Sequence, residues 1–408
     1  MSDSVPDGWK SVKLDDVAEE TSDRVDNPSK SGYDRFVGLE HLDSGELIVR
    51  RWGSTADLLS AMKLFKSGDI LIGRRNAYLK RASKAEFDGV CSGDAYVVRE
   101  KPGKIAEGLL PIILNSDSFW DYTIAHASGT MSKRAKWRDL TEYSFLLPSM
   151  DKQRRIATTL WAAEDCIVKG EGFVVAAERV KQILMQELLS EGIEKAEFKE
   201  IKGFGKIPKN WEIKRIQEIV EVRGRIGWRG LTTEDYVDDG PILLGVRNIL
   251  ATGILDISDI TRIPIKKYED SPEIMVQKGD VLLAKTGATI GKTCVINNVP
   301  EPMTVNAAVN ILRPKKNLDS VFLNYLVSSE YLQKQMQLAT SASARGNLFQ
   351  KDINNFICVY PPFPEQLQIA TILTCCDETI AAARANVGAA KALKMKMINE
   401  MLSPNANA

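Results

Sequence analysis

Residues 279–296, GDVLLAKTGATIGKTCVI, have the residue types needed to bind a phosphate group. A short apolar run leads into a glycine-rich loop that ends in Gly-Lys-Thr at 291–293. A phosphate-binding loop has four residues between its first glycine and Gly-Lys-Ser/Thr, whereas here only residues 288–290 intervene. The chain then continues as TCVIN, which predicts a strand rather than a helix whose N-terminus holds a phosphate. The spacing and this strand argue against nucleotide binding.

Other residues with catalytic potential are few. The two histidines, His41 and His126, exclude a His-rich metal site, and we interpret both as polar loop residues. The six cysteines follow neither a disulfide nor a metal-ligand spacing, so we interpret them as reduced thiols. The segment VYPPFP is similar to the Asp/Asn-Pro-Pro-Tyr/Phe motif of amino-methyltransferases, but Tyr360 stands where that motif needs an acid or amide. A binding protein is therefore the stronger interpretation.

Positive charge is concentrated in two segments, although the net charge of the chain is zero. Residues 74–84, RRNAYLKRASK, hold five basic side chains and no acidic one. Residues 131–138, MSKRAKWR, hold four and again no acid, while acids gather elsewhere, as in LDDVAEETSDRVD at 14–26. Such segregation of charge favours nucleic-acid binding.

The composition is that of a soluble protein of two or three domains. The chain has 408 residues, of which 44% are hydrophobic and 26% charged. Its N-terminal segment is acidic and polar, which predicts no signal peptide. Because no apolar run approaches the ~18 residues of a membrane span, we expect a cytoplasmic protein without membrane contact.

One sequence unit of about two hundred residues occurs twice. Residues 147–167, LPSMDKQRRIATTLWAAEDCI, match residues 360–380, YPPFPEQLQIATILTCCDETI, at a shift of 213 from 147 to 360. Trp9 matches Trp211, and FKSGDILIG matches VQKGDVLLA. Small differences in shift between these matches require only loop insertions.

Each unit combines short β-rich runs with one long helix. Apolar or small residues recur at alternating steps of four and three from Ile156 to Leu188 and from Ile369 to Met401, which is a heptad seam. Lys181 and Lys394 interrupt the two seams at the same step. We expect the helices, roughly 50 Å long, to pair antiparallel with a globule at each end. The alternative is that each helix packs only on its own globule.

The repeat also clarifies the glycine-rich loop. AKTGATIGKT lies on GRRNAYLKRA, so that Lys285 matches Arg74 and Lys292 matches Arg81. The glycines have no counterpart in the first copy. What the copies share is a basic loop after a strand, and the glycines would let a tight turn approach a phosphate backbone.

This duplicated chain resembles the specificity subunits of type I restriction–modification systems. The resemblance covers essentially the whole chain. It rests on VPDGW and IPKNW, on SGDILIG and KGDVLLAKTGATIGK, on SGTMSKRAKWRDL and SARGNLFQKDI, and on PPFPEQLQIATIL. The start of the first long helix departs from the pattern, with Met-Asp-Lys at 150–152 where the second copy has Phe-Pro-Glu at 363–365.

The resemblance implies an α+β fold with two α/β target-recognition globules. They would be related by an internal pseudo-two-fold repeat and separated by a pair of long antiparallel helices. The expected domains are recognition domain 1 at 1–149, spacer helix 1 at 150–192, recognition domain 2 at 193–360 and spacer helix 2 at 361–408. Each globule would read one half of a split site in double-stranded DNA, and the helices would fix the gap between the halves.

The resemblance also implies that catalysis belongs to other subunits. The expected partners are two methyltransferase (modification) subunits, docked on the helices, and two restriction subunits where the system has them. The chain itself would be non-catalytic and bind no cofactor, with S-adenosylmethionine and ATP on the partner subunits.

Candidates for DNA contact lie in the basic loops. Cations suit phosphates or guanine edges, amides can read adenine, and aromatic rings can pack on a sugar or an exposed base. In the first copy the candidates are Arg74, Arg75, Asn76, Tyr78, Lys80, Arg81, Lys133, Arg134, Lys136 and Trp137. In the second copy they are Lys285, Thr286, Thr289, Lys292, Arg345, Asn347, Gln350 and Lys351.

Two other functions are open at this point. The chain could be a structural adaptor whose helices organise partner proteins without reading DNA, or a stand-alone nucleotide-dependent enzyme. Salt-dependent binding to a defined duplex would separate the first from a DNA reader. The second would require nucleotide binding through residues 287–293 alone.

Overall fold

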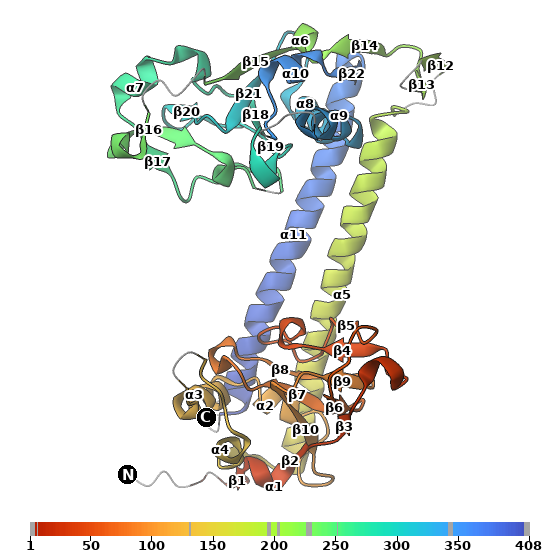
Figure 1. Ribbon diagram of the computed structural model, residues 1–408, viewed down its shortest axis with the longest axis vertical. Coiled ribbons are helices and arrows are strands. Elements are labelled where there is room, and N and C mark those ends of the chain that lie inside the picture. The colour runs from red at the N-terminus through yellow and green to blue at the C-terminus, as the bar shows by residue number, and fades with distance from the viewer. Residues whose placement is uncertain are drawn as a thin grey trace. The chain divides into compact units, whose positions relative to one another are not determined.

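A computed structural model describes residues 5, 7–129, 132–193, 197–201, 205–225, 231–250, 252–341 and 346–403. The chain divides into two compact units, unit 1 with residues 1–173 and 383–408, and unit 2 with residues 174–382. Each unit contains small β-sheets, short helices and a part of both long helices (Figure 1). The α+β fold class is therefore confirmed, with a long helix between two sheet-rich parts of the chain.

Unit 1 is built on two antiparallel-rich sheets and a two-stranded ladder. The four-stranded sheet has the order β2 (Ala18–Thr21), β10 (Ala95–Glu100), β7 (Ile70–Gly73), β8 (Ala82–Lys84). The five-stranded sheet has the order β3 (Arg24–Val25), β6 (Met62–Phe65), β9 (Gly89–Cys91), β4 (Arg35–Val37), β5 (Gly53–Ser54). The ladder pairs β1 (Lys10–Lys13) with β11 (Ser144–Leu147). The short helices are α1 (Leu14–Val17), α2 (Leu110–Ile113), α3 (Asp117–His126) and α4 (Trp137–Thr141).

Unit 2 repeats the four-stranded sheet of unit 1, with a smaller second sheet and one more ladder. Its four-stranded sheet has the order β15 (Val220–Gly224), β21 (Val309–Pro314), β18 (Val281–Ala284), β19 (Thr293–Val295). A three-stranded sheet has the order β17 (Thr261–Arg262), β16 (Val237–Leu244), β20 (Met303–Val305). Two ladders pair β14 (Glu212–Arg215) with β22 (Ile357–Tyr360) and β12 (Phe198–Ile201) with β13 (Gly205–Pro208). The short helices are α6 (Ile216–Ile219), α7 (Ile265–Glu269), α8 (Ser320–Ser328), α9 (Glu330–Ser341) and α10 (Gln350–Asn355).

The sequence repeat is reproduced down to single hydrogen bonds. In unit 1 the backbone N–H of Ala106 donates to Oε1 of Gln153 at 2.9 Å, and Nε2 of Gln153 donates to the carbonyl of Pro148 at 2.9 Å. In unit 2 the N–H of Asp319 donates to Oε1 of Gln366 at 3.1 Å. Both glutamines are buried, so each offers a fixed acceptor that ties the start of a long helix to its own sheet domain.

The long helices are α5 (Met150–Leu188) and α11 (Phe363–Met401). Within unit 1, Glu164 of α5 contacts Lys394 of α11 at 2.6 Å, and Glu171 contacts Lys391 at 2.7 Å. The residue numbers rise along one helix as they fall along the other, so this part of the pair is antiparallel. A Cβ on Gly170 would lie 2.8 Å from Cγ2 of Val387, which explains the small residue in the seam.

Within unit 2, the remaining parts of α5 and α11 pair in the same sense. Lys181 of α5 contacts Asp377 of α11 at 2.5 Å. The N–H of Ile193, just beyond α5, donates to Oε1 of Glu365 near the start of α11 at 3.2 Å. The seam positions are buried or half-buried in both units, so the prediction that the helices pair with each other is confirmed within each unit.

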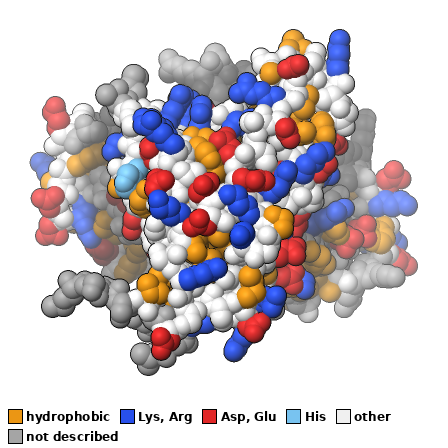
Figure 2. Space-filling view, turned by 90° about the horizontal axis from the view of Figure 1, so that it is seen from below, with side chains coloured by type: hydrophobic (Ala, Val, Ile, Leu, Met, Phe, Trp, Pro, Cys, Tyr) orange, Lys and Arg blue, Asp and Glu red, His pale blue; other side chains and the backbone are white. Residues whose placement is uncertain are grey.

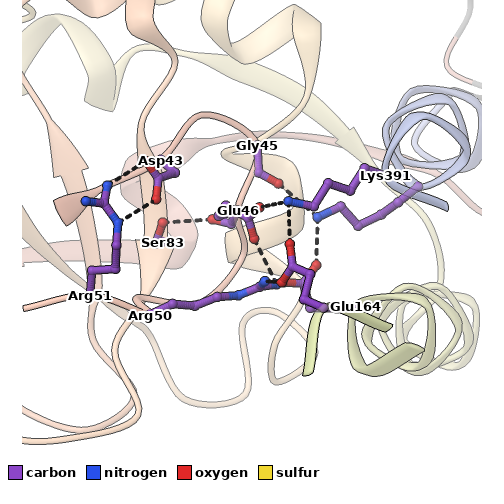
Figure 3. A network of polar contacts seen from close by, with 10 residues as sticks. Asp43, Gly45, Glu46, Arg50, Arg51, Ser83, Glu164 and Lys391 are labelled. Carbon is purple, nitrogen blue, oxygen red and sulfur yellow. Dashed lines mark hydrogen bonds and ion pairs between the residues drawn. The ribbon is translucent and has the colours of Figure 1, made fainter. Parts of the chain in front are cut away.

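A network of charged side chains joins the sheet domain of unit 1 to both helices (Figure 3). Glu46 accepts from Lys391 at 2.7 Å and pairs with Arg50 at 2.8 Å, and Arg50 in turn pairs with Glu164. Lys394 donates to the carbonyl of Gly45 at 2.9 Å. The Lys394–Glu164 pair lies in the interior of the unit, with side chains 2% and 0% exposed, whereas Arg50 and Lys391 are partly exposed.

The two copies differ in sequence where the long helices begin, at 150–152 and 363–365. This difference changes a side-chain contact but not the position at which the helix begins. In unit 2 the buried Trp211 donates its Nε1–H to Glu365 at 2.8 Å. In unit 1 the position equivalent to Glu365 is Lys152, whose Nζ lies 4.9 Å from the centre of the Trp9 ring. A cation over an aromatic face replaces a hydrogen bond, and α5 and α11 begin at equivalent positions of the repeat.

In the part of the chain that the structure describes, none of the helices combines the length and the apolar character that crossing a membrane requires.

Candidate nucleic-acid interface

The two basic segments of the first copy form one continuous surface in unit 1. Arg75 and Arg134 form an antiparallel backbone bridge, and the N–H of Asn76 donates to the carbonyl of Lys133 at 2.9 Å. Oγ of Ser132 accepts from Nε of Arg75 at 3.2 Å and donates to Oδ1 of Asn76 at 3.1 Å. These bonds hold segments that are more than fifty residues apart in sequence as a single loop pair.

Three arginines of this loop pair surround one carboxylate, that of Asp94. The distances from the Asp94 oxygens are 3.4 Å to Nε of Arg74, 3.8 Å to Nη1 of Arg75 and 3.7 Å to Nη2 of Arg134. Three cations and one anion leave two net positive charges. On the face shown in Figure 2, lysine and arginine side chains are likewise interspersed with acidic ones.

Sequence reasoning missed Asp94, because it lies outside both basic segments, directly before β10. One signal was available. The repeat aligns Asp94 with Ala308, directly before β21, so the carboxylate belongs to one copy only.

The turn after β7 exposes an aromatic ring. Asn76 and Lys80 both adopt the left-handed backbone conformation, with φ of 55° and 47°, on either side of the short 3-10 helix η3 (Ala77–Leu79). This leaves Tyr78 61% exposed. Lys80 pairs with Asp117 at 2.9 Å, and the half-buried Arg81 packs its Cβ side against Gly73.

The remaining candidates of the first copy differ in accessibility. Lys133 and Lys136 are exposed. Trp137 is half-buried, and its ring lies 5.6 Å from that of Tyr96, with which it packs. Of the two aromatic candidates, Tyr78 is therefore the accessible one. The role of each of these residues in DNA contact stays a prediction.

The glycine-rich loop of unit 2 is held like its counterpart in unit 1. The N–H of Lys285 donates to the carbonyl of Ala308 at 2.9 Å, just as the N–H of Arg74 donates to the carbonyl of Asp94 at 3.0 Å. The carbonyl of Lys285 accepts from the N–H of Leu348 at 3.0 Å. The predicted equivalence of Lys285 and Arg74 is thus reproduced in backbone hydrogen bonds.

This loop is a turn between two strands and not the start of a helix. Thr286 precedes the single turn η7 (Gly287–Thr289), where Oγ1 of Thr289 donates to the Thr286 carbonyl at 3.0 Å. Gly287 and Gly291 have φ of 66° and 89°, a backbone conformation that glycine adopts more readily than residues with a side chain. The chain then enters β19, as the sequence predicts, so the geometry of a phosphate-binding loop is absent from residues 284–295.

The cations of the loop in unit 2 have a different electrostatic environment from those of unit 1. Burial lowers the pKa of Lys285, because the low-dielectric surroundings disfavour its charged form. Among the described residues, no carboxylate lies within ion-pair distance of Lys285 or of the half-buried Lys292. A phosphate group would give Lys285 the negatively charged partner that it lacks among the described residues.

The last candidates of the second copy lie around α10. Asn347 and Gln350 are half-buried, whereas Lys351 is exposed, with its Nζ 5.9 Å from the ring of Phe349. Arg345 lies outside the described residues. Gly224 of β15 leaves room for the Gln350 amide, because a Cβ there would lie 2.8 Å from its Nε2.

Both histidines have local structural roles. Nδ1 of His41 accepts from the N–H of Gly38 at 2.9 Å, and Nδ1 of His126 lies 2.8 Å from the carbonyl of Tyr122. What the loops offer chemically is guanidinium and ammonium donors on exposed turns, which suits recognition of phosphates and base edges.

Comparisons with known proteins agree with this chemistry. A family model described as the type I restriction modification DNA specificity domain matches residues 208–387. The MjaVIII specificity subunit of a type I restriction enzyme from Methanocaldococcus jannaschii is 20% identical over 98% of this chain and 93% of its own length. The MjaIX specificity subunit of the same organism is 29% identical over 45% of this chain and 41% of its own length.

Two solved structures share the fold. A chain from a structure of a type I restriction–modification system has a TM-score of 0.60 and 21% identity, over 98% of this chain and 99% of that one. The S subunit of the type I system of M. genitalium has a TM-score of 0.57 and 13% identity, over 99% of this chain and 98% of that one.

Proposed function

Because the chain belongs to the DNA specificity subunits of type I restriction–modification systems, we propose that each of its two units reads one half of a split DNA site. The observation that carries this proposal is the loop pair of unit 1. Arg74, Arg75 and Arg134 converge there from two segments, and Lys285 occupies the equivalent place in unit 2. One set of basic loops per unit is what two half-sites require.

The chain is the DNA-recognising, non-catalytic subunit of its complex, and modification and restriction subunits are its partner classes. We propose two modification subunits and two restriction subunits for each copy of this chain, in keeping with its internal repeat. S-adenosylmethionine and ATP then bind to those partners, and this chain determines which DNA sequence the complex recognises.

The outer side of α5 supports docking of a modification subunit on the helices. In unit 2, Val175, Val180 and Ile183 are 66%, 52% and 49% exposed. All three are exposed and lie outside the half-buried seam of α5 that packs against α11. Exposed apolar side chains grouped on a helix face are typical of a protein–protein interface.

Genome-wide adenine methylation in a host without other methyltransferases tests the proposed function. Co-expression of this chain with its modification subunit should produce methylation at a two-part sequence motif, and the modification subunit alone should not. The same methylation pattern with and without this chain would exclude a role in recognition.

Salt-dependent binding separates a DNA reader from an adaptor. Replacing Arg74, Arg75 and Arg81 by alanine should weaken binding of the assembled complex and flatten its salt dependence. The slope should fall by about one unit for each of these arginines that meets a phosphate. The exposed Arg154, on α5 outside the loops, provides a matched control. An adaptor predicts no effect from either substitution.

A further inference from the structure

The Asp94 cluster, defined as Asp94 with Arg74, Arg75 and Arg134, differs from the structural ion pairs of the same unit. Nε and Nη2 of Arg99 donate to the two carboxylate oxygens of Asp69 at 2.7 and 2.8 Å. Unit 2 has the equivalent pair Arg313–Asp280, with the same two hydrogen bonds at the same distances. A bidentate pair that both copies retain serves the fold.

The contacts of the Asp94 cluster are longer and occur in one copy only. Its distances of 3.4, 3.8 and 3.7 Å exceed the about 2.7–2.9 Å of a charge-assisted hydrogen bond. Asp94 therefore does not saturate the donors around it. The side chains of Arg75 and Arg134 are 49% and 50% exposed, so their remaining N–H groups face solvent, whereas Arg74 lies deeper, 6.0 Å from the Tyr96 ring.

The carboxylate offsets part of the positive charge of this cluster, which makes it a weaker phosphate site than three arginines without an acid would be. An anion held among the arginines repels the phosphate backbone, while it costs little against the neutral edge of a base. A guanine presents two adjacent acceptors, O6 and N7, in the major groove, and the planar fork of arginine matches them. Charge and geometry together favour a guanine edge over a phosphate.

Asp94 is also held in place independently of the arginine side chains. Its backbone N–H donates to Oγ of Ser92 at 3.2 Å, and its carbonyl accepts from the N–H of Arg74 at 3.0 Å. The backbone of Asp94 is therefore fixed, and its carboxylate is held next to the forks of Arg75 and Arg134 before DNA binds.

We infer that Asp94 is a positioning residue that presents the arginine forks of Arg75 and Arg134 to a guanine of the half-site read by unit 1. This inference rests on the proposed function. In unit 2, Ala308, Thr286 and Asn347 stand in place of Asp94, Arg75 and Arg134, so the pair of arginine forks has no counterpart there. The half-site read by unit 2 therefore has no guanine contact of this kind.

The test compares methylation motifs of the assembled complex, with its modification subunit, for the wild type and for D94N, R75K and R134K. Lysine keeps the charge that binds phosphate but lacks the planar fork that matches the O6 and N7 acceptors of guanine in a fixed geometry. All three variants should relax the motif at one and the same G·C pair, lowering discrimination there by about tenfold or more. The other half-site should stay unchanged.

A matched control is D43N, which removes a carboxylate from the exposed pair Arg51–Asp43 of the same unit. It should leave the motif intact. If D94N fails to assemble with the modification subunit, the exposed R75K and R134K still decide the question.

The failures can be told apart. A wild-type complex that leaves no two-part motif contradicts the proposed function. A clear wild-type motif that is unchanged in R75K and R134K overturns this inference alone. Stronger binding of D94N to all sequences alike, with an unchanged motif, would assign the cluster to phosphates and overturn it as well.

Discussion

At the scale of single residues, we expect Lys285 to couple DNA binding to pH. Its folded-state pKa lies below the ordinary 10.5, because burial disfavours the ammonium form. The unfolded chain therefore binds more protons between the lowered pKa and 10.5. Below the lowered pKa, the folded protein bears the full free-energy cost of a charged, buried Lys285. The free energy of unfolding therefore rises as pH increases from the lowered pKa to 10.5.

A phosphate beside Lys285 reverses that shift, and binding should therefore take up a proton. We expect the affinity of the assembled complex for its DNA to fall as pH rises through the lowered pKa of Lys285. K285R should show no such dependence, since a guanidinium stays charged throughout. Calorimetry in buffers of different ionisation enthalpy measures the proton uptake. Equal uptake by wild type and K285R would show that Lys285 does not meet a phosphate.

Runs of cations without acids predicted the basic loops of the first copy, and the repeat extended that prediction to the second copy. The sequence could not predict that residues 74–76 and 132–134 share one surface, since that depends on backbone bonds between loops distant in sequence. Asp94 could not be predicted for the same reason. Its importance comes from what folds around it and not from its neighbours in the chain.

At the scale of elements, the heptad seam predicted both long helices, and the short apolar runs predicted β7, β10, β18 and β21. Strands of two residues, such as β3 and β5, carry no periodicity and could not be predicted. Lys181 and Lys394 are conspicuous in the sequence because they interrupt apolar seams, whereas their acidic partners are not. A signal for the partners nevertheless exists, because Glu164 and Asp377 are related by the same repeat shift as Lys181 and Lys394.

These repeat-related ion pairs form a natural comparison. Lys394–Glu164 is almost fully buried, whereas the side chains of Lys181 and Asp377 are 25% and 36% exposed. Removing one partner of a buried pair leaves an uncompensated charge and costs about 3–5 kcal/mol, whereas exposed pairs contribute about 0–1 kcal/mol. The loss of stability in K394M should lie near the lower end of the range for buried pairs, because Arg50 still contacts Glu164.

Hydrogen exchange of the two units measures this difference. K394M should lower the protection of β7 in unit 1 by about 3 kcal/mol. K181M should lower that of β18 in unit 2 by about 1 kcal/mol. Equal decreases in both variants would show that burial does not determine the contribution of these pairs.

The exposed apolar side of α5 allows a test of partner docking. Replacing Val175, Val180 and Ile183 by serine should weaken co-purification with the modification subunit, because the buried apolar area of the interface shrinks. The fold should persist, since the three side chains are exposed. Leu338 of α9, 73% exposed in the same unit, provides the control, and L338S should assemble normally. Normal assembly of the triple variant would place the docking surface elsewhere.

At the scale of the whole molecule, α5 and α11 are the only described elements shared by both units, so their length is the quantity that can set the gap between half-sites. Adding one heptad to each helix, after residue 173 in α5 and after residue 382 in α11, keeps the seam in phase. The addition lengthens each helix by about 10 Å at ~1.5 Å per residue. DNA rises ~3.4 Å per base pair, so the gap of the methylated motif should grow by about three base pairs.

Each half-site should keep its sequence in this variant, because the reading loops at 74–81, 132–137 and 285–292 are unchanged. Adding four residues to each helix instead lengthens it by about 6 Å and turns the following seam by about 40°, which local unwinding of the pair can absorb. We expect the gap in that variant to grow by about one or two base pairs. A heptad variant that kept the original gap, or that changed the bases within a half-site, would show that the helices do not measure the distance between the two recognition sequences.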